Sequence, residues 1–307
     1  MASPMTRAQI ARQLQRGLNY VFGMKHKMWD EEWRQCCFQI DTSEKAYEED
    51  VQMVGLAGAY EKEEGTDYTI DGGSEGYAAR YVNLTFGLGV TFTEEAREDG
   101  LYLDIAKTMG AELARAHQYT KEVRHANIFN RAFNSSYKGG DGVELCGSHT
   151  LWNGDTLSNE LSTAADLSEE ALEDLCIQIE GATNHRGVPR ALKPQKLLVH
   201  RENDFNAQRI LNSTARPGTA LNDLNAIKSM GKLPGGYMVN HYFTDPDAWF
   251  ICVDGVEKGL RHFVRKKIAR RMYVDDKNGN MTYTTRERYA EGWTEFEAVW
   301  GSDGSGT

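Results

Sequence analysis

The segment from Thr93 to Phe133 contains no proline, and it constrains the fold more than any other part of the sequence. Apolar residues recur in it at steps of three or four, as at Leu101, Ile105 and Met109, which predicts one long amphipathic helix. At 1.5 Å per residue, even thirty residues of helix would be about 45 Å long, which exceeds the width of a compact domain. Such a helix serves as a spine, and its polar flank must be solvated or packed on another surface.

An alternating segment precedes this helix. Six apolar residues occupy every second position, and polar or small residues stand between them: Val82, Leu84, Phe86, Leu88, Val90 and Phe92. This period of two predicts a half-buried strand. A weaker strand is expected over Val51–Tyr60, and the charged, turn-rich interval Glu61–Gly76 separates the two. Together they predict a long two-stranded loop with a polar tip.

The rest of the chain is expected to combine short helices and strands. Helices are expected from Ser168 onward and over Asp204–Leu211, and strands over Leu197–Val199, Tyr237–Phe243 and Ala248–Val253. The C-terminal part is expected to form a β-meander with an Asn-Gly turn, made of three segments: Phe263–Val274, Met281–Tyr289 and Ala298–Trp300.

Composition limits the function. The 307 residues carry 35 basic and 45 acidic side chains, a net charge of −10, which argues against a protein whose main task is to bind phosphate backbones. At 40% hydrophobic residues the chain can bury a core. We expect neither a membrane span nor a signal peptide. The five cysteines, including the adjacent Cys36 and Cys37, are expected to be reduced thiols in a cytosolic setting.

Motifs for catalysis and cofactor binding are missing. Gly231-Lys232 is followed by Leu233, so no phosphate-binding loop is present. Cys146 and His149 have a spacing that zinc can use, but no second pair accompanies them. His117 and His125 on the long helix are interpreted as part of a charged helix face, with general acid–base catalysis as the alternative. We therefore predict no catalytic residue, no metal and no cofactor.

The densest cationic run lies near the C-terminus. On a regular strand, Arg265, Lys267 and Arg271 would share one face, and Lys266 and Arg270 the other, so the run forms no single nucleic-acid-binding stripe. Solvated charge, a subunit interface and nucleic-acid contact remain open interpretations at this point. The candidates for contacts between subunits are the following charged residues: Glu61, Lys62, Glu63, Glu64, Arg261, Arg265, Lys267 and Arg271.

The order of these segments, from about Val51 to Gly301, resembles the major capsid proteins of tailed bacteriophages with the Hong-Kong-ninety-seven-type fold. Local signals are similar to the major head subunit of Mu-like phages. They occur in this order: Leu197-Leu198-Val199-His200 with Asp204-Phe205 and Ile210–Ser213, then Asn222 and Asn225, Asp245–Phe250, Arg286-x-Arg288, Gly292-Trp293 and Val299–Ser302.

The resemblance implies the α+β fold class. It also implies a domain plan: an N-terminal arm over 1–50, an extended β-hairpin loop over 51–93, a peripheral domain with the spine helix over 94–161 and an axial α/β domain over 162–262. Residues 263–307 would return to the peripheral sheet and add the last strand and the C-terminal tail. Little chain precedes the arm, so we expect the scaffolding function to reside in a cleaved segment or a separate protein.

The resemblance also implies a function. The chain would be a structural protein and no enzyme, self-assembling as pentamers and hexamers into an icosahedral shell that encloses double-stranded DNA. The implied partners are other copies of the chain, a scaffolding protein, a portal, and packaged DNA bound on the inner face without sequence specificity; no membrane and no cofactor are implied. The implied location is the virion, after assembly in the host cytoplasm.

Two alternatives remain open from the sequence. A hydrolase with an unrecognised carboxylate or histidine pair would form a compact particle of fixed low oligomeric state with a buried pair of shifted pKa. Another structural protein of the virion, such as a tail or decoration component, would lack the combination of spine helix and axial domain.

Overall fold

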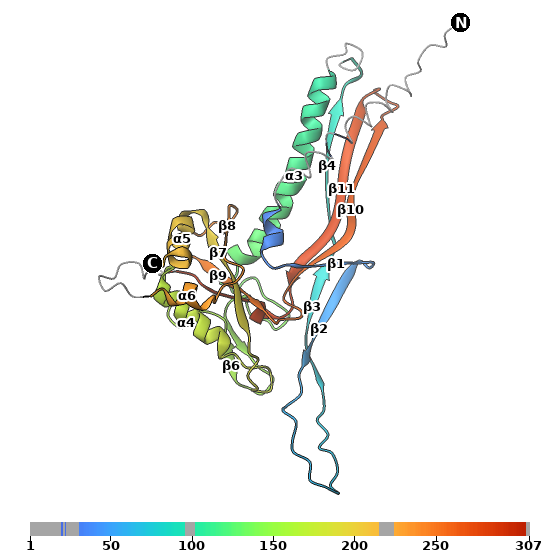
Figure 1. Cartoon of the computed structure of the whole chain (residues 1–307). Helices are drawn as coiled ribbons and strands as arrows, with labels where there is room; N and C mark the ends of the chain where they lie inside the picture. The colour runs from blue at the N-terminus through green and yellow to red at the C-terminus, as the bar shows by residue number, and fades with distance from the viewer. Residues whose placement is uncertain (1–19, 21, 23–30, 96–101, 215–223, 305–307) are drawn as a thin grey trace.

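The computed structural model describes residues 20, 22, 31–95, 102–214 and 224–304, with the side chains of 102–107 left aside. The molecule is elongated. In Figure 1 a compact lobe carries a long helix and a strand pair toward one end, and a second, thinner hairpin projects toward the other end. The two extensions and the lobe correspond to separate sheets, which are taken in turn below.

The first sheet has four strands in the order β1-β10-β11-β4. Its long hairpin consists of β10 (Leu260–Val274) and β11 (Met281–Trp293), and Gly279 adopts a positive φ of 67° in the turn between them. β4 (Leu84–Phe92) is antiparallel to β11, and the short β1 (Gln39–Thr42) is parallel to β10. The alternating strand and the C-terminal hairpin predicted from the sequence are confirmed.

The pairing predicted for the alternating strand is wrong. It was expected to pair with a strand over Val51–Tyr60, but β4 pairs with β11. The projecting hairpin is instead formed by β2 (Tyr47–Val54) and β3 (Ser74–Val82), and the chain passes from β3 to β4 at Asn83. The reason is that the alternation reports which face of a strand is buried but not which strand it pairs with. The apolar face of β4 packs against the long helix, where Phe92 joins Leu113 and Ala114 in one cluster and Arg124 lies over the Phe86 ring at 5.1 Å.

The long helix is confirmed. α3 spans Tyr102–Asn130, 29 residues, which corresponds to about 44 Å of helix. It lies along the face of the first sheet (Figure 1), where Leu113 and Ala114 pack with Tyr283 of β11 and Ala126 and Phe129 join the core of the lobe. The predicted stripe residues Leu101 and Ile105 lie outside the described side chains. Among the described helices, none combines the length and the apolar character needed to cross a bilayer.

The lobe is built on a second four-stranded sheet in the order β12-β9-β7-β8. Its strands are β7 (Lys193–His200), β8 (Tyr237–Asn240), β9 (Trp249–Asp254) and β12 (Val299–Ser302). Helices α4 (Glu169–Glu180), α5 (Asp204–Asn212) and α6 (Ala226–Met230) flank it, and a small hairpin, β5 (Ser148–Thr150) with β6 (Thr156–Ser158), lies beside it. The strands and helices predicted for this region are confirmed within a few residues.

The last strand does not belong to the predicted β-meander. After β11 the chain turns through the short 3-10 helix η3 (Phe296–Ala298), and β12 then pairs with β9 in the second sheet. Trp300 is fully buried in the core of the lobe, against residues from α4, β7 and β9. β12 follows β11 closely in the sequence, but it pairs with β9 because this pairing buries the Trp300 indole in the lobe.

Much of the predicted N-terminal arm packs on its own subunit. The 3-10 helix η1 (Glu32–Gln35) lies against α3, and its Trp33 is only 1% exposed. β1 then joins the first sheet beside β10. Of the residues before 31, only Tyr20 and Phe22 are described, and Phe22 is buried with Arg270 stacked over its ring at 4.8 Å. The described part of segment 1–50 is therefore an integral part of the fold.

The cap of α4 gives a prediction for stability. Ser168 accepts a hydrogen bond from the backbone N–H of Ala171 at 3.1 Å through its side chain. Replacing Ser168 with Ala should lower the free energy of unfolding by about 1 kcal/mol, because that N–H loses its partner. Ser168→Asp keeps an acceptor there and is the control. Equal urea denaturation midpoints for wild type and Ser168→Ala would contradict the role of the cap.

Candidate assembly surfaces and the polar layer behind them

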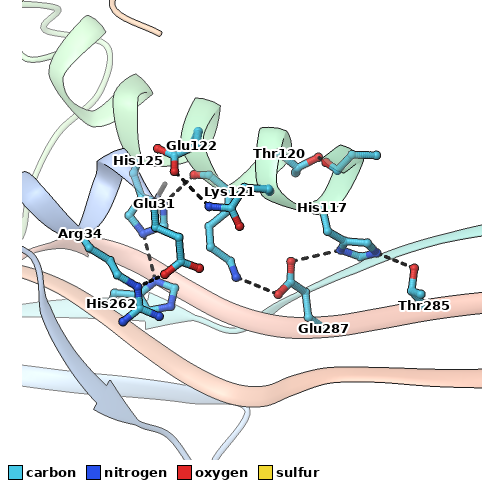
Figure 2. Close-up of polar contacts among 12 residues, drawn as sticks. Glu31, Arg34, His117, Thr120, Lys121, Glu122, His125, His262, Thr285 and Glu287 are labelled. Atoms are coloured by element: carbon cyan, nitrogen blue, oxygen red, sulfur yellow. Dashed lines mark hydrogen bonds and ion pairs between the residues drawn. The ribbon is translucent and has the colours of Figure 1, made fainter. Parts of the chain in front are cut away.

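A layer of polar side chains joins the spine helix to the first sheet, as Figure 2 shows. His117, Lys121 and His125 are spaced by four residues and therefore share one face of α3. That face is turned toward β10 and β11, and His117 and His125 are 3% and 1% exposed. The sequence-based interpretation as a charged, solvated helix face is wrong, since the period places these residues on the same side as the apolar stripe.

Glu287 of β11 is the centre of this layer. It lies 3.1 Å from His117 Nδ1 and 3.0 Å from Lys121 Nζ, and its side chain is 5% exposed. Burial alone would raise the pKa of Glu287, but the hydrogen bond from His117 and the positive charge of Lys121 outweigh it and lower the pKa below its usual value. The carboxylate thus stays ionised and fixes α3 on β11.

Both ring nitrogens of His117 have partners on the first sheet. Thr285 Oγ1 donates to the carbonyl of Leu88 at 3.1 Å, so the same oxygen accepts from His117 Nε2 at 2.8 Å. The other ring nitrogen lies 3.1 Å from a carboxylate oxygen of Glu287. Through these contacts the ring links α3, β11 and β4.

A second part of the layer is neutral. His125 Nδ1 donates to the carbonyl of Lys121 at 2.7 Å, and its Nε2 accepts from His262 Nδ1 at 3.0 Å. Trp33 stacks on His125 with ring centroids 4.3 Å apart. Burial lowers the pKa of His125 to about 3 and that of His262 to about 2, with nearby positive charges adding to the effect.

Glu122 ties the N-terminal segment to this layer. It accepts hydrogen bonds from the backbone N–H of Trp33 at 2.9 Å and from the Gln118 amide at 3.1 Å. Burial raises its pKa to about 7 against the lowering effect of these bonds. The sequence-based interpretation as a charged helix face did not predict this contact, by which Glu122 holds the segment around Trp33 in place.

The acidic candidates lie at the tip of the β2–β3 hairpin. Glu61, Lys62, Glu63 and Glu64 are all exposed, and Lys62 Nζ lies 4.9 Å from the ring centroid of Tyr68. Apolar side chains of the same segment are exposed as well, among them Tyr60 at 68% and Ile70 at 93%. Both the charged and the apolar side chains at this tip are therefore left exposed by the described part of the chain.

Arg186 holds the base of this hairpin. Its Nε donates to the carbonyl of Gly55 at 3.2 Å, and its Nη2 donates to the carbonyl of Gly72 at 2.7 Å. Asp71 adds an ion pair with Arg186 at 3.5 Å and accepts from the N–H of Ala57 at 2.8 Å. One side chain thus joins both strands of the hairpin just beyond the last paired residues, and sets the direction in which the tip projects.

The basic candidates do not act as one group. Arg261 forms ion pairs at 3.2 Å with Asp41 and with Asp50 of its own chain, and Arg265 donates to the carbonyl of Ser43 at 3.5 Å. Lys267 and Arg271 are exposed. The strict alternation assumed from the sequence is wrong here, because the register between β10 and β11 shifts twice, between Val264 and Lys266 and between Lys266 and Ala269.

The Cys146 and His149 pair is part of the packing. His149 stacks on Phe296 with ring centroids 3.6 Å apart, and its Nδ1 hydrogen-bonds to Asp141. Burial raises the pKa of the Cys146 thiol well above its usual value. Within the described part of the chain, no three His, Cys, Asp or Glu side chains gather in a way that could hold a metal ion. Cys36 is buried and Cys37 is exposed.

Solved capsid structures share this fold. A virus-like particle from Pyrococcus furiosus matches with a TM-score of 0.55 at 11% identity, covering 94% of this chain and 98% of that chain. The capsid of cyanophage P-SCSP1u matches with 0.56 at 9% identity over 88% and 87% of the two chains. The capsid of a native gene transfer agent particle matches with 0.57 at 10% identity over 91% of each. The fold is therefore that of the Hong-Kong-ninety-seven-type capsid proteins.

The family model for phage capsid proteins matches residues 78–301, and the chain therefore belongs to the phage capsid protein family. No curated protein sequence matches it. The protein is thus a structural component of the phage virion and no enzyme. The hydrogen-bonded pair of His125 and His262 belongs to the polar layer that packs α3 on the sheet.

The neutral histidine pair predicts a specific pH dependence. Below its usual pKa of 6.5, His262 takes up a proton in the unfolded chain but not in the folded one, whose pKa is about 2, so wild type loses stability as the pH falls. In His262→Gln this contribution is absent. The difference in free energy of unfolding between the two proteins should change by about 1.4 kcal/mol per pH unit between pH 6 and 4.5.

Urea denaturation of the unassembled subunit at several pH values measures this difference. Because Glu122 titrates with the opposite sign, only the comparison with the variant isolates His262. Met238→Leu, a buried substitution without a titrating group, is the control and should shift the curve in parallel with wild type. Parallel curves for His262→Gln would contradict a neutral, buried His262.

Arg186 gives a prediction for local order. In Arg186→Ala the hairpin base loses its contacts with Gly55, Gly72 and Asp71, so amide hydrogen exchange over 55–73 should accelerate. Global stability should change by less than about 0.5 kcal/mol, since the side chain lies near the surface. Arg209→Ala on the exposed face of α5 is the control. Unchanged exchange in Arg186→Ala would show that the hairpin base is fixed by other contacts.

Proposed function

We propose that the protein is the major shell subunit, which assembles as pentamers and hexamers into a closed icosahedral shell around double-stranded DNA. One observation carries the proposal: the hairpin tip over 55–73 projects from the body with exposed Tyr60, Tyr68 and Ile70, which no described part of the own chain covers. Exposed apolar groups in this arrangement are typical of surfaces that another subunit buries.

The domain plan is proposed in terms of the observed elements. The β2–β3 hairpin would be the extended loop that lies over an adjacent subunit. The first sheet with α3 would form the peripheral domain, and the second sheet with α4, α5 and α6 would form the axial domain around the five-fold and six-fold axes. β12 would then be the strand by which the C-terminal part returns to the axial domain.

Charge supports contacts between neighbouring copies. Glu61, Lys62, Glu63 and Glu64 are exposed at the hairpin tip, and Lys267 and Arg271 are exposed on β10. Acidic and basic surfaces on separate elements of one subunit are complementary between copies. Arg265 would contribute at the margin, whereas the ion pairs of Arg261 with Asp41 and Asp50 serve the subunit itself.

Further partners are proposed from the family. A scaffolding protein would guide shell size, a portal would occupy one vertex, and packaged DNA would lie against the inner face without sequence-specific contacts. The net charge of −10 supports weak adhesion to DNA, since like charges repel. Assembly would take place in the host cytoplasm before the shell becomes part of the virion.

The hairpin provides the test. Replacing residues 58–70 with a short glycine linker leaves β2 and β3 paired, so the variant should fold as wild type does but form no closed shells. Negative-stain microscopy of the purified protein measures assembly, and circular dichroism checks the fold. Replacing residues 275–279 of the β10–β11 turn with a different five-residue hairpin turn is the matched control. Closed shells from the 58–70 variant would refute the role of the hairpin.

A further inference from the structure

Three cysteines meet where the end of η1 packs on β9 of the lobe. Cys252 of β9 is fully buried, and its Sγ lies 3.8 Å from the carbonyl oxygen of Cys36. From the same position the Cys252 thiol hydrogen-bonds to the sulfur of Cys37. Cys37 and Cys252 are far apart in the sequence, and the fold makes their thiols neighbours.

The backbone at Cys37 is unusual for a cysteine. Its φ is 62°, in the left-handed region that glycine or asparagine normally occupies after the end of a helix. The chain is held on both sides of this residue, since Trp33 and Phe38 are 1% and 7% exposed. A glycine would adopt this conformation more easily, so what the cysteine adds at this position is its thiol.

Cys37 also differs from the other cysteines in its surroundings. It is exposed, and the remaining four are buried: Cys36, Cys146, Cys176 and Cys252. The hydrogen bond from Cys252 lowers the pKa of Cys37, and the positive charge of Lys196 adds to this effect. Lys196 is held at the end of η1, where its Nζ donates to the carbonyl of Gln35 at 3.2 Å. An exposed thiol with a lowered pKa is the reactive kind.

The neighbouring Cys36 is a packing residue. Its Sγ lies 3.8 Å from Met238 Sδ and 3.7 Å from Asn240 Nδ2, both on β8. Burial raises the pKa of Cys36 to about 12, which keeps this thiol protonated and unreactive. The second thiol available to Cys37 is therefore that of Cys252. An exposed reactive cysteine beside a second, resolving cysteine is typical of thiols that respond to oxidation.

We propose that Cys37 and Cys252 form a redox pair, which takes a small-molecule disulfide such as oxidised glutathione as its oxidant and closes into an internal disulfide. The bond ties the segment after η1 to β9. The chain belongs to a family of virion proteins, and a virion leaves a cytoplasm that keeps thiols reduced for surroundings in which disulfides persist. The pair is thus a dithiol inside the cell and a covalent tether in the released particle.

The closure is a thiol–disulfide exchange in two steps. The Cys37 thiolate attacks one sulfur of oxidised glutathione, which forms a mixed disulfide on Cys37 and releases one glutathione thiolate. The Cys252 sulfur then attacks the Cys37 sulfur and displaces the second glutathione. The two cysteines lose two electrons, which reduce one glutathione disulfide to two thiols, and the two cysteine protons end on the two glutathione molecules.

Mass spectrometry of the full-length protein after incubation with oxidised glutathione tests the pair. Tryptic digestion without reduction places Cys37 in peptide 35–45 and Cys252 in peptide 233–258, and wild type should yield these two peptides joined by one disulfide. Cys37→Ser should yield no joined peptides. Cys36→Ser removes the adjacent thiol of the same peptide, so it is the matched control and should yield the joined peptides as wild type does.

Cys252→Ala distinguishes a pair from a single reactive thiol. This variant keeps Cys37 but lacks the second sulfur, so it should accumulate glutathione bound to Cys37, whereas wild type replaces that glutathione by the internal bond. Lys196→Gln should slow alkylation of Cys37 by iodoacetamide at pH 7 about threefold, because the positive charge favours the thiolate. Lys138→Gln makes the same charge change at an exposed site elsewhere and should leave the rate unchanged.

Unfolding measures what the bond does to the subunit. The disulfide closes a loop that spans most of the chain, and such a cross-link restricts the unfolded state. Oxidised wild type should therefore unfold at a higher urea concentration than the reduced protein, and oxidation should leave the midpoint of Cys37→Ser unchanged. A lower midpoint for oxidised wild type would show that the bond distorts the segment, and the tether would be refuted.

Other outcomes would also overturn the inference. One is wild type in which all five thiols stay free, or in which the reaction stops at glutathione bound to Cys37. Another is Cys37→Ser that still joins the two peptides, because Cys36 would then be the partner of Cys252. If Cys252→Ala does not fold, wild type, Cys37→Ser and Cys36→Ser still decide. These measurements use the unassembled subunit, so their results are independent of whether shells form.

Discussion

The ionised contact between α3 and β11 is the constraint on which the rest of the structure depends. Glu287 is buried, and a buried carboxylate is tolerated only where charged partners and hydrogen bonds surround it. His117 and Lys121 can both contact this carboxylate only when α3 lies at one position along β11. That position fixes the register of the spine helix, and Glu122 and His125 then hold Trp33 and the N-terminal segment beside it.

The projecting hairpin leaves apolar side chains uncovered within the described part of the chain. The β2–β3 hairpin leaves the body at a base held by Arg186, and its acidic and aromatic tip has no cover in the described chain. Exposed apolar groups of this kind are typical of surfaces that another subunit buries. This exposure agrees with a capsid protein, whose family the chain belongs to.

Local patterns predicted much of the fold but little of its pairing. The proline-free apolar stripe predicted α3, and Ser168 with its following apolar face predicted α4, because these signals act within one element. The partner of β4 and the sheet of β12 depend on long-range burial, as with Trp300 in the lobe. The two bulges of β10 also escaped prediction: alternation assigns every residue a face, and nothing in Arg265–Ile268 marks an extra residue.

The sequence alone determined which segments form helices or strands at most positions. It also determined the acidic character of the hairpin tip and the family resemblance, because these depend only on residue order and spacing. Only the tertiary structure decided which charges are available for a neighbour. Arg261 and Lys267 both carry a positive charge in the same segment. Arg261 forms ion pairs with Asp41 and Asp50, whereas Lys267 is exposed and forms no ion pair with any described residue. The physical reason is that the effect of a charge depends on its burial and its partners, which are set by segments distant in sequence.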